Sequence, residues 1–207
     1  MSIDLTAANA AVADKSPQEI IAWAIAQAEN PVVTTNFRPY ESVILHMAVQ
    51  AKPDIRVLWV DSGYNTSATY RFAEQVIQDL NLNVEVYIPR ETAARRNVLM
   101  KGIPDIDDPL HEEFTRQVKL EPFQRALAEI KPDVWLNAIR KDQTEFRQSL
   151  EIVSQSKDGI LKVAPLFNLT EADLDAYLAE HNLPNEHDYF DPTKAVETRE
   201  CGLHTQL

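Results

Sequence analysis

The sequence contains little cysteine and few basic residues, and each shortage excludes a class of protein. Cysteine occurs once in 207 residues, so one chain can form neither an internal disulfide nor a cysteine-ligated iron–sulfur cluster. Lysine and arginine number 20 against 32 acidic residues, which gives a net charge of −12. This balance argues against a nucleic-acid binder and against attraction to anionic lipid.

The sequence also lacks a long apolar segment. No run approaches the roughly 18 residues that a membrane span needs. Residues 1–16 include Asp4 and Asp14 and do not have the apolar core of a signal peptide. Hydrophobic residues nevertheless make up 44% of the chain, which is enough for a proper core. We therefore expect a cytoplasmic protein with a single domain over residues 1–207.

Short apolar runs alternate with amphipathic helical patterns along most of the chain. Strands are predicted at 32–35, 55–60, 84–88, 134–138 and 160–164, and helices at 17–30, 41–51, 67–80, 91–100, 121–130 and 171–181. This alternation indicates βα units around a mostly parallel sheet. Residues 185–207 are polar and have few apolar anchors, so they form either a disordered tail or a segment folded over the site.

Ligands of parallel sheets bind at the carboxyl ends of the strands, so the segments after the strands are the first candidates for a site. After the first strand comes a polar turn, residues 34–42, that leads into a helix N-terminus and so offers N–H groups to an anion. The turn has no glycine, so its backbone cannot approach a phosphate as freely as a usual phosphate loop. An ordinary βα turn would look the same.

Two further strand ends carry polar residues. Gly63, after the second strand, is one of only four glycines, which indicates a special backbone angle, a close ligand approach, or merely a strand-ending turn. Arg140 and Lys141 are adjacent cations after the strand at 134–138. Such a pair suits a bound anion, although a solvated loop would have the same sequence.

The cysteine lies in a polar segment near the end of the chain, residues 199–204, Arg-Glu-Cys-Gly-Leu-His. Cys201 is a candidate nucleophile because neighbouring Arg199 and His204 would favour its thiolate. Two alternatives stay open: an incidental exposed thiol, and half of a metal site, since Cys201 and His204 have ligand-like spacing. The other histidines form no matching pair, so we expect no metal.

Together these segments resemble the phosphoadenylyl-sulfate (PAPS) reductase family over residues 32–204. The motifs that carry the resemblance are Glu-Cys-Gly-Leu-His at 200–204, Asp-Ser-Gly-Tyr at 61–64 with Thr-Tyr-Arg-Phe at 69–72, Arg-Lys-Asp-Gln at 140–143, and Lys119 with Pro122. The match is specific because four motifs occur in the family's order. It implies a three-layer α/β/α fold of the adenine-nucleotide α-hydrolase-like type, with a mobile C-terminal tail at 185–207 that carries the catalytic cysteine.

The resemblance also implies an activity, the reduction of 3′-phosphoadenylyl sulfate to sulfite and adenosine 3′,5′-bisphosphate in assimilatory sulfate reduction. Cys201 would attack the sulfate sulfur and become an S-sulfonate. Because the chain has no second cysteine, the reducing thiol must come from outside, and the family implies reduced thioredoxin or glutaredoxin. A homodimer with no bound cofactor is expected.

Site residues are carried over from the family by position. The expected catalytic residues are Cys201, Lys119, His204 and Arg199. The expected substrate-binding residues are Thr34, Thr35, Asn36, Phe37, Arg38, Ser42, Asp61, Ser62, Gly63, Arg140 and Lys141. Lys119 falls at the sulfate-contacting lysine, residues of the 34–42 turn would bind the phosphate side, and residues 61–63 would face the nucleoside. The sequence does not decide whether His204 tunes the thiol or contacts the anion.

Two features depart from the family pattern. The phosphate turn is usually Ser-rich with a glycine after phenylalanine, and here Arg38 would supply a charge contact instead of a close backbone approach. Phe114 and Thr115 stand where related adenylyl-sulfate (APS) reductases have a cysteine pair, which favours the cluster-free PAPS branch. The alternatives are a cluster-free APS reductase, an ATP pyrophosphatase of the same fold, and a nucleotide-binding module that uses the thiol as a redox sensor.

Overall fold

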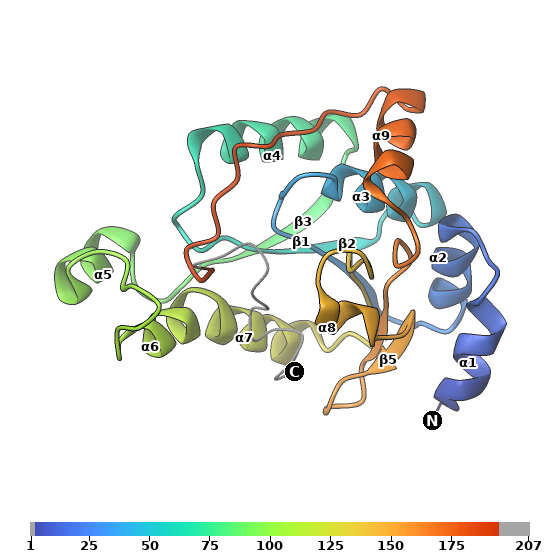
Figure 1. Cartoon of the computed structure of the whole chain (residues 1–207), viewed down its shortest axis with the longest axis horizontal. Coiled ribbons are helices and arrows are strands. Elements are labelled where there is room, and N and C mark those ends of the chain that lie inside the picture. Colours follow the sequence, from blue (N-terminus) through green and yellow to red (C-terminus); the bar gives the residue numbers. More distant parts are fainter. Residues whose placement is uncertain (1–2, 195–207) are drawn as a thin grey trace.

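A six-stranded sheet lies between two layers of helices in the computed structural model, which describes residues 3–194 (Figure 1). The strands are β1 (Pro31–Thr35), β2 (Arg56–Val60), β3 (Asn83–Tyr87), β4 (Val134–Leu136), β5 (Val153–Gln155) and β6 (Leu161–Val163). Their order in the sheet is β3-β2-β1-β4-β6-β5, and all neighbours are parallel except β5 and β6. The predicted mostly parallel sheet is confirmed.

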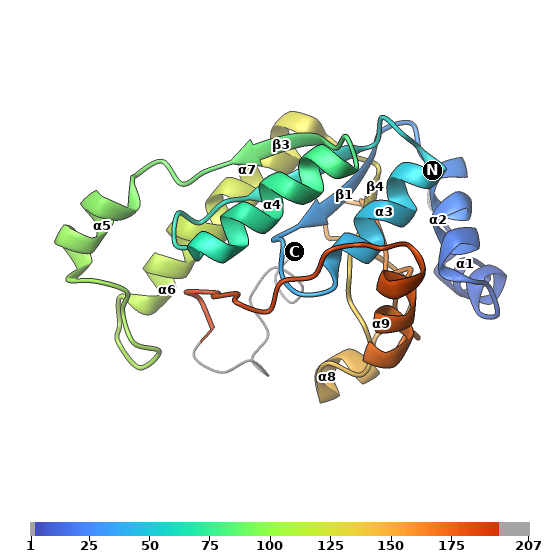
Figure 2. The ribbon, with the colours of Figure 1, turned by 90° about the horizontal axis from the view of Figure 1, so that it is seen from above.

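Helices cover both faces of the sheet. They are α1 (Leu5–Val12), α2 (Pro17–Ala26), α3 (Glu41–Ala51), α4 (Ser67–Asp79), α5 (Ala93–Met100), α6 (His111–Thr115), the π-helical turn η1 (Arg116–Leu120), α7 (Glu121–Ile130), α8 (Glu145–Gln148) and α9 (Glu171–Glu180). Helices α1 to α4 and α9 share one apolar core with the sheet, and α7 packs on the opposite face (Figures 1 and 2). In the described part of the chain, no helix is long and apolar enough to cross a membrane.

The order of the strands places a natural binding crevice beside β1. The chain adds β2 and β3 on one side of β1 and then continues with β4 on the other side. In doubly wound sheets, ligands bind outside the carboxyl ends of the strands where the order reverses in this way. The segments that follow β1 and β4 therefore meet at one crevice.

The described part of the expected tail, residues 185–194, crosses this crevice. In both views this segment runs from α9 alongside α4 toward the strand ends (Figures 1 and 2). The hydroxyls of Thr66 and Thr69 at the start of α4 donate to the carbonyl of Asp188, at 2.8 and 2.9 Å. The backbone N–H of Tyr40 donates to Asn185 Oδ1 at 2.8 Å. Of the two alternatives for the tail, residues 185–194 fold over the site.

The remaining tail, residues 195–207, lies outside the described residues, and with it Arg199, Cys201 and His204.

Helix α1 closes the free edge of the sheet at β5. The side-chain amide of Asn9 in α1 pairs with the backbone of Val153, as a neighbouring strand would. Its Nδ2 donates to the carbonyl of Val153 at 2.8 Å, and its Oδ1 accepts from the N–H of Val153 at 2.9 Å. An uncovered edge strand exposes unpaired backbone groups to other chains. Neither α1 nor β5 was predicted, because both are short and have no clear periodicity.

We expect Asn9→Ala to lower the free energy of unfolding by about 1–3 kcal/mol, because it leaves two part-buried backbone groups of Val153 without partners. Urea unfolding monitored by circular dichroism measures this change. Thr6→Ala, at an exposed position of the same helix, is the control for helix propensity and should change stability by less than about 0.5 kcal/mol. Equal effects of the two substitutions would contradict the role of Asn9.

Candidate active site

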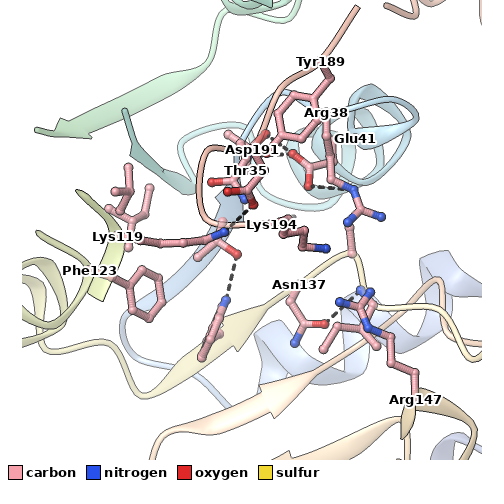
Figure 3. A pocket seen from close by; sticks show the side chains of 17 residues that line it. Thr35, Arg38, Glu41, Lys119, Phe123, Asn137, Arg147, Tyr189, Asp191 and Lys194 are labelled. Carbon is pink, nitrogen blue, oxygen red and sulfur yellow. Dashed lines mark hydrogen bonds and ion pairs between the residues drawn. The ribbon is translucent and has the colours of Figure 1, made fainter. Parts of the chain in front are cut away.

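Two adjoining cavities lie at the carboxyl ends of β1, β2 and β4, and Figure 3 shows the residues that line the inner one. The inner cavity has a volume of about 80 Å³, and the outer one has a volume of about 1020 Å³. They share five lining residues: Arg38, Arg147, Tyr189, Asp191 and Lys194. The outer volume is of the size that small-molecule sites use, roughly 300–1,000 Å³. The crevice expected from the strand order is therefore present.

Cations gather around the inner cavity although the chain as a whole is acidic. Its charged lining residues in the described part of the chain are Arg38, Lys119, Arg147 and Lys194, with Glu41 and Asp191 as carboxylates. Lys194 extends toward Arg38 and Arg147, while Lys119 approaches from the opposite wall (Figure 3). A local excess of cations in a chain of charge −12 favours an anionic ligand here.

The turn between β1 and α3 is closed by a carboxylate of the chain itself. The hydroxyl of Thr35 and the backbone N–H of Asn36 both donate to Glu41 Oε2, each at 2.7 Å. Glu41 is only 6% exposed, and its Oε1 lies 3.7 Å from Arg38 Nε. The carboxylate thus takes two donors that a phosphate turn would offer to a ligand. The side chain of Arg38 is then the group of this turn that can contact an anionic ligand.

The backbone of the same turn explains how it forms without glycine. Phe37 and Tyr40 have φ values of 52° and 70°, in the left-handed region that usually favours glycine. The ring of Phe37 is buried and packs edge-on against Trp59, with ring centroids 4.9 Å apart, and against Phe72 at 6.5 Å. Burial of this ring offsets the strain of the backbone. Phe37 is therefore directed into the core and away from the cavity.

Lys119 reaches the cavity from a π-helical turn, and the sequence accounts for that turn. Pro122 has no N–H and cannot form the usual hydrogen bond to the residue four positions earlier. The N–H of Glu121 donates instead to the carbonyl of Arg116, five positions earlier. Such an extra residue in a helix is frequent at functional sites. Val118 and Lys119 of this turn are both buried.

The ammonium group of Lys119 is paired with a carboxylate from the segment that crosses the crevice. Lys119 Nζ lies 2.6 Å from Asp191 Oδ2, and the two side chains are 8% and 10% exposed. Asp191 Oδ1 accepts from the N–H and the hydroxyl of Thr193, at 3.0 and 2.7 Å. Burial opposes ionisation of Asp191, but the charge of Lys119 and these hydrogen bonds outweigh it and lower its pKa. The pair is a salt bridge at neutral pH.

The Asp61 loop is organised by one carboxylate oxygen. Asp61 Oδ1 accepts from the N–H of Gly63, the amide of Asn65 and the hydroxyl of Tyr70, each at 2.9 Å. Burial and the bond to Asp61 raise the pKa of Tyr70 to about 12. Gly63 has φ of 80°, so the special backbone angle expected from the sequence is confirmed. Ser62 lines a small recess that also touches Lys119 and Asp191.

The loop after β4 supplies two buried guanidinium groups. Arg140 is 5% exposed, pairs with Asp142 at 3.0 Å and lines the outer cavity. Arg147 is 4% exposed, donates to Gln143 and lines both cavities. The neighbouring Lys141 is exposed and donates to Asn168 Oδ1 at 3.0 Å. Of the two adjacent cations after this strand, only Arg140 lines a cavity.

The structure brings part of the expected site together. The expected residues that line a cavity or the recess are Thr34, Thr35, Asn36, Arg38, Ser62, Lys119 and Arg140. Those that line none of these are Phe37, Ser42, Asp61, Gly63 and Lys141. The hydroxyl of Ser42 donates to the carbonyl of Pro184 instead. Among residues 3–194, no three His, Cys, Asp or Glu side chains meet as metal ligands.

Other lining residues were not among those expected. Among them are Glu41, Trp135, Asn137, Arg147, Tyr189, Asp191 and Lys194. The sequence did indicate Arg147, since it follows Arg140 in the same cationic loop. It did not indicate Asp191, because an acidic residue in a polar segment is typical of solvent-exposed surface. Its role depends on a contact with Lys119 across 72 residues of sequence.

The lowered pKa of Asp191 predicts a pH-dependent contribution to stability. A carboxylate whose pKa is lowered on folding stabilises the protein above its unfolded pKa, near 3.8, and loses that effect as the pH falls through the folded value. At pH 7, Asp191→Asn should lower the free energy of unfolding by about 3 kcal/mol, because buried Lys119 loses the carboxylate with which it forms a salt bridge. Urea titrations of both proteins between pH 7 and pH 3 should show this difference shrinking below about pH 4. A difference that is constant with pH would contradict the ion pair.

Comparison with known proteins shows the family of the chain. The family model of the phosphoadenosine phosphosulfate reductase domain matches residues 30–191. A phosphoadenosine 5′-phosphosulfate reductase of Synechococcus sp. is 37% identical over 228 residues, which cover 97% of this chain and 97% of that protein. One from Vibrio campbellii is 35% identical and covers 95% and 84% of the two chains.

Solved structures show the same fold. The phosphoadenylyl-sulfate reductase from Candida auris, solved as a phosphate complex, has a TM-score of 0.72 and 27% identity and covers 86% of this chain and 85% of its own. An FMN adenylyltransferase from Candida glabrata has a TM-score of 0.58 at 11% identity, with 82% and 56% covered, and shares the fold alone. The predicted adenine-nucleotide α-hydrolase-like architecture is confirmed. The chain belongs to the phosphoadenosine phosphosulfate reductase family.

Proposed function

We propose that this chain reduces 3′-phosphoadenylyl sulfate to sulfite, with adenosine 3′,5′-bisphosphate as the second product. The observation that carries the proposal is the group of four cations around the inner cavity of an acidic chain. The substrate bears phosphate and sulfate groups, and cations compensate for the hydration that these groups lose when they enter a cavity. Curated relatives are named for this activity and are similar over nearly the whole chain.

The chemistry uses Cys201 as the nucleophile. Its thiolate attacks the sulfate sulfur, the bond from that sulfur to the bridging phosphate oxygen breaks, and the nucleotide leaves as adenosine 3′,5′-bisphosphate. The cysteine is left as an S-sulfonate. One thiol of reduced thioredoxin or glutaredoxin then attacks Cys201 Sγ, releases sulfite and forms a mixed disulfide, which its second thiol resolves. The donor must be external because the chain has a single cysteine.

The residues of the two cavities take the other roles. Lys119 balances the charge that moves on the sulfate group, and Arg38, Arg140 and Arg147 hold the phosphates. Thr34 Oγ1 already accepts from Trp135 Nε1 at 2.8 Å, which fixes its hydroxyl at the wall of the inner cavity. Arg199 and His204 act from the tail beside Cys201. In this proposal residues 1–207 form one domain of a cytoplasmic homodimer that serves sulfate assimilation.

Packing around Phe114 supports the cluster-free branch. Phe114 is fully buried and packs against Tyr64, with ring centroids 5.5 Å apart, and against His111 at 6.4 Å. An aromatic contact thus fills the position where APS reductases carry cysteines. The outer cavity adds Arg140 to the cations that line the inner one, and a further cation suits the extra 3′-phosphate, so PAPS should be preferred over APS in sulfite release.

The covalent intermediate gives the sharpest test of this proposal. Without reductant, enzyme and PAPS should release about one equivalent of nucleotide and then stop. Mass spectrometry should find a sulfonate on the peptide that contains Cys201, and reduced thioredoxin should discharge it as sulfite. Cys201→Ser should bind nucleotide but form no adduct, because a serine hydroxyl is scarcely ionised. Sulfite release by the serine variant at the normal rate would refute Cys201 as the nucleophile.

Lys119→Ala should lower the turnover of PAPS by about 10²-fold or more, as expected when a charge that stabilises the transition state is removed. Steady-state sulfite release with thioredoxin measures this effect. Lys15→Ala, at an exposed position remote from the cavities, is the matched control and should keep the full rate. Similar rates for the two variants would remove Lys119 from the proposed mechanism.

A further inference from the structure

Helix α5 carries a buried arginine that the proposed mechanism does not use. Arg96 is 1% exposed, and α5 lies beside α6 at one end of the molecule (Figures 1 and 2). In the described part of the chain, Arg96 forms no ion pair, and its Nη1 is buried without a hydrogen-bond partner. Because a buried charge without a counter-charge is costly, its presence needs an explanation beyond packing.

The guanidinium of Arg96 contacts the π-helical turn η1 through Gln117. Its Nε donates to Gln117 Oε1 at 3.0 Å, and its Nη2 donates to the carbonyl of Glu91, two residues before α5, at 2.9 Å. One planar group thus joins the start of α5 to η1. Gln117 precedes Lys119 by two residues in the same turn. Movement of Gln117 would therefore displace the backbone from which Lys119 extends into the cavity.

The amide of Gln117 is held in the orientation that Arg96 requires. Gln117 Nε2 donates to Glu113 Oε1 at 2.8 Å, and the guanidinium of Arg116 donates to both oxygens of the same carboxylate at 2.6 Å. The bonds from Arg116 and Gln117 lower the pKa of Glu113 to about 2, so Glu113 is ionised at neutral pH. With the amide nitrogen of Gln117 directed at a carboxylate, its oxygen is left to accept from Arg96.

The next residue of α5 contacts a second segment beside Lys119. Asn97 Oδ1 accepts from the hydroxyl of Tyr64 at 2.8 Å, and Tyr64 belongs to the Asp61 loop. Ser62 of that loop and Lys119 line the same recess. Within the described residues, α5 itself lines neither the two cavities nor the recess. Helix α5 therefore braces two segments of the site from outside it.

We propose that Arg96 is a positioning residue for Lys119: its guanidinium holds η1 through Gln117 and so keeps the ammonium group of Lys119 where it meets an anionic ligand. Asp191 contacts the end of the lysine side chain, whereas Arg96 fixes the backbone that carries it. Such precision matters because displacement of a reacting or stabilising group by about 1 Å can cost 10²-fold in rate. The effect on turnover rests on the proposed function, whereas the positioning requires only an anion at Lys119.

Binding of inorganic sulfate, titrated by calorimetry at constant ionic strength, tests the positioning without turnover. Gln117→Ala removes the link to Arg96 without changing the net charge, and it should weaken sulfate binding about fivefold, within the usual coupling between contacting residues. Arg96→Met should have a similar effect. If Arg96→Met fails to fold, Gln117→Ala decides alone. Unchanged binding by Gln117→Ala, or no sulfate binding by the wild type, would overturn the proposal.

Arg95→Met is the matched control for Arg96→Met. It removes the same charge one residue earlier, from a side chain that is 68% exposed and paired with Glu91. The dissociation constant of sulfate should change by less than about twofold, because an exposed charge is screened by water. Equal losses in Arg95→Met and Arg96→Met would overturn the proposal, since they would reflect net charge alone.

A double-mutant cycle separates positioning from a purely structural role. In a Lys119→Met background, neither Gln117→Ala nor Arg96→Met should weaken sulfate binding further, because the group that they position is absent. Further weakening of the same size would mean that the substitutions act on the cavity as a whole. That result would overturn the proposal.

Turnover of PAPS separates this inference from the proposed function. Arg96→Met should lower the kcat of sulfite release about tenfold, more than it raises KM, because Lys119 acts on charge that moves in the transition state. Weaker sulfate binding by Gln117→Ala without sulfite release by the wild type would uphold the positioning and refute the proposed function. Sulfite release by the wild type, with sulfate binding and kcat unchanged in both variants, would refute the positioning and leave the proposed function intact.

Discussion

The cost of burying cations is the constraint on which the site depends. A guanidinium or ammonium group taken out of water is costly unless a counter-charge accompanies it. The cavity gathers four cations, and the described residues supply two carboxylates among them, Glu41 and Asp191. These carboxylates balance part of the positive charge and leave a net positive charge that favours an anion.

The two carboxylates belong to different parts of the structure. Glu41 forms part of the turn that replaces a phosphate loop, and the left-handed backbone of Phe37 and Tyr40 is fixed by a ring packed into the core. This arrangement moves anion contact from the backbone to the side chain of Arg38. The flexible side chain of an arginine can adjust to the position of a bound anion, whereas the backbone N–H groups of a glycine turn fix that position. The backbone of this turn is therefore rigid, and its contact with an anion is adjustable.

Much of the fold was predictable from the sequence, because apolar periodicity and caps act locally. The capping boxes at Ser16 and Thr170 are present, and the five parallel strands lie within about two residues of their expected bounds. The short elements α8 and β5 were missed, since three or four residues cannot show a period. Of the four cations around the inner cavity, strand ends indicated Arg38 and Arg147, the family resemblance indicated Lys119, and Lys194 was not expected. The sequence did not indicate the carboxylates of the site, because the Lys119–Asp191 contact depends on tertiary structure alone.

Lys119, a proposed catalytic residue, lies in a π-helical turn that a nearby proline favours. Proline at 122 prevents a regular helical bond, and the chain responds with the π-helical turn that buries Val118 and Lys119 side by side. Lys119 lies inside this turn, three residues before the proline, and lines the inner cavity. A lysine buried to this extent needs an anionic partner, and in the described part of the chain Asp191 is one.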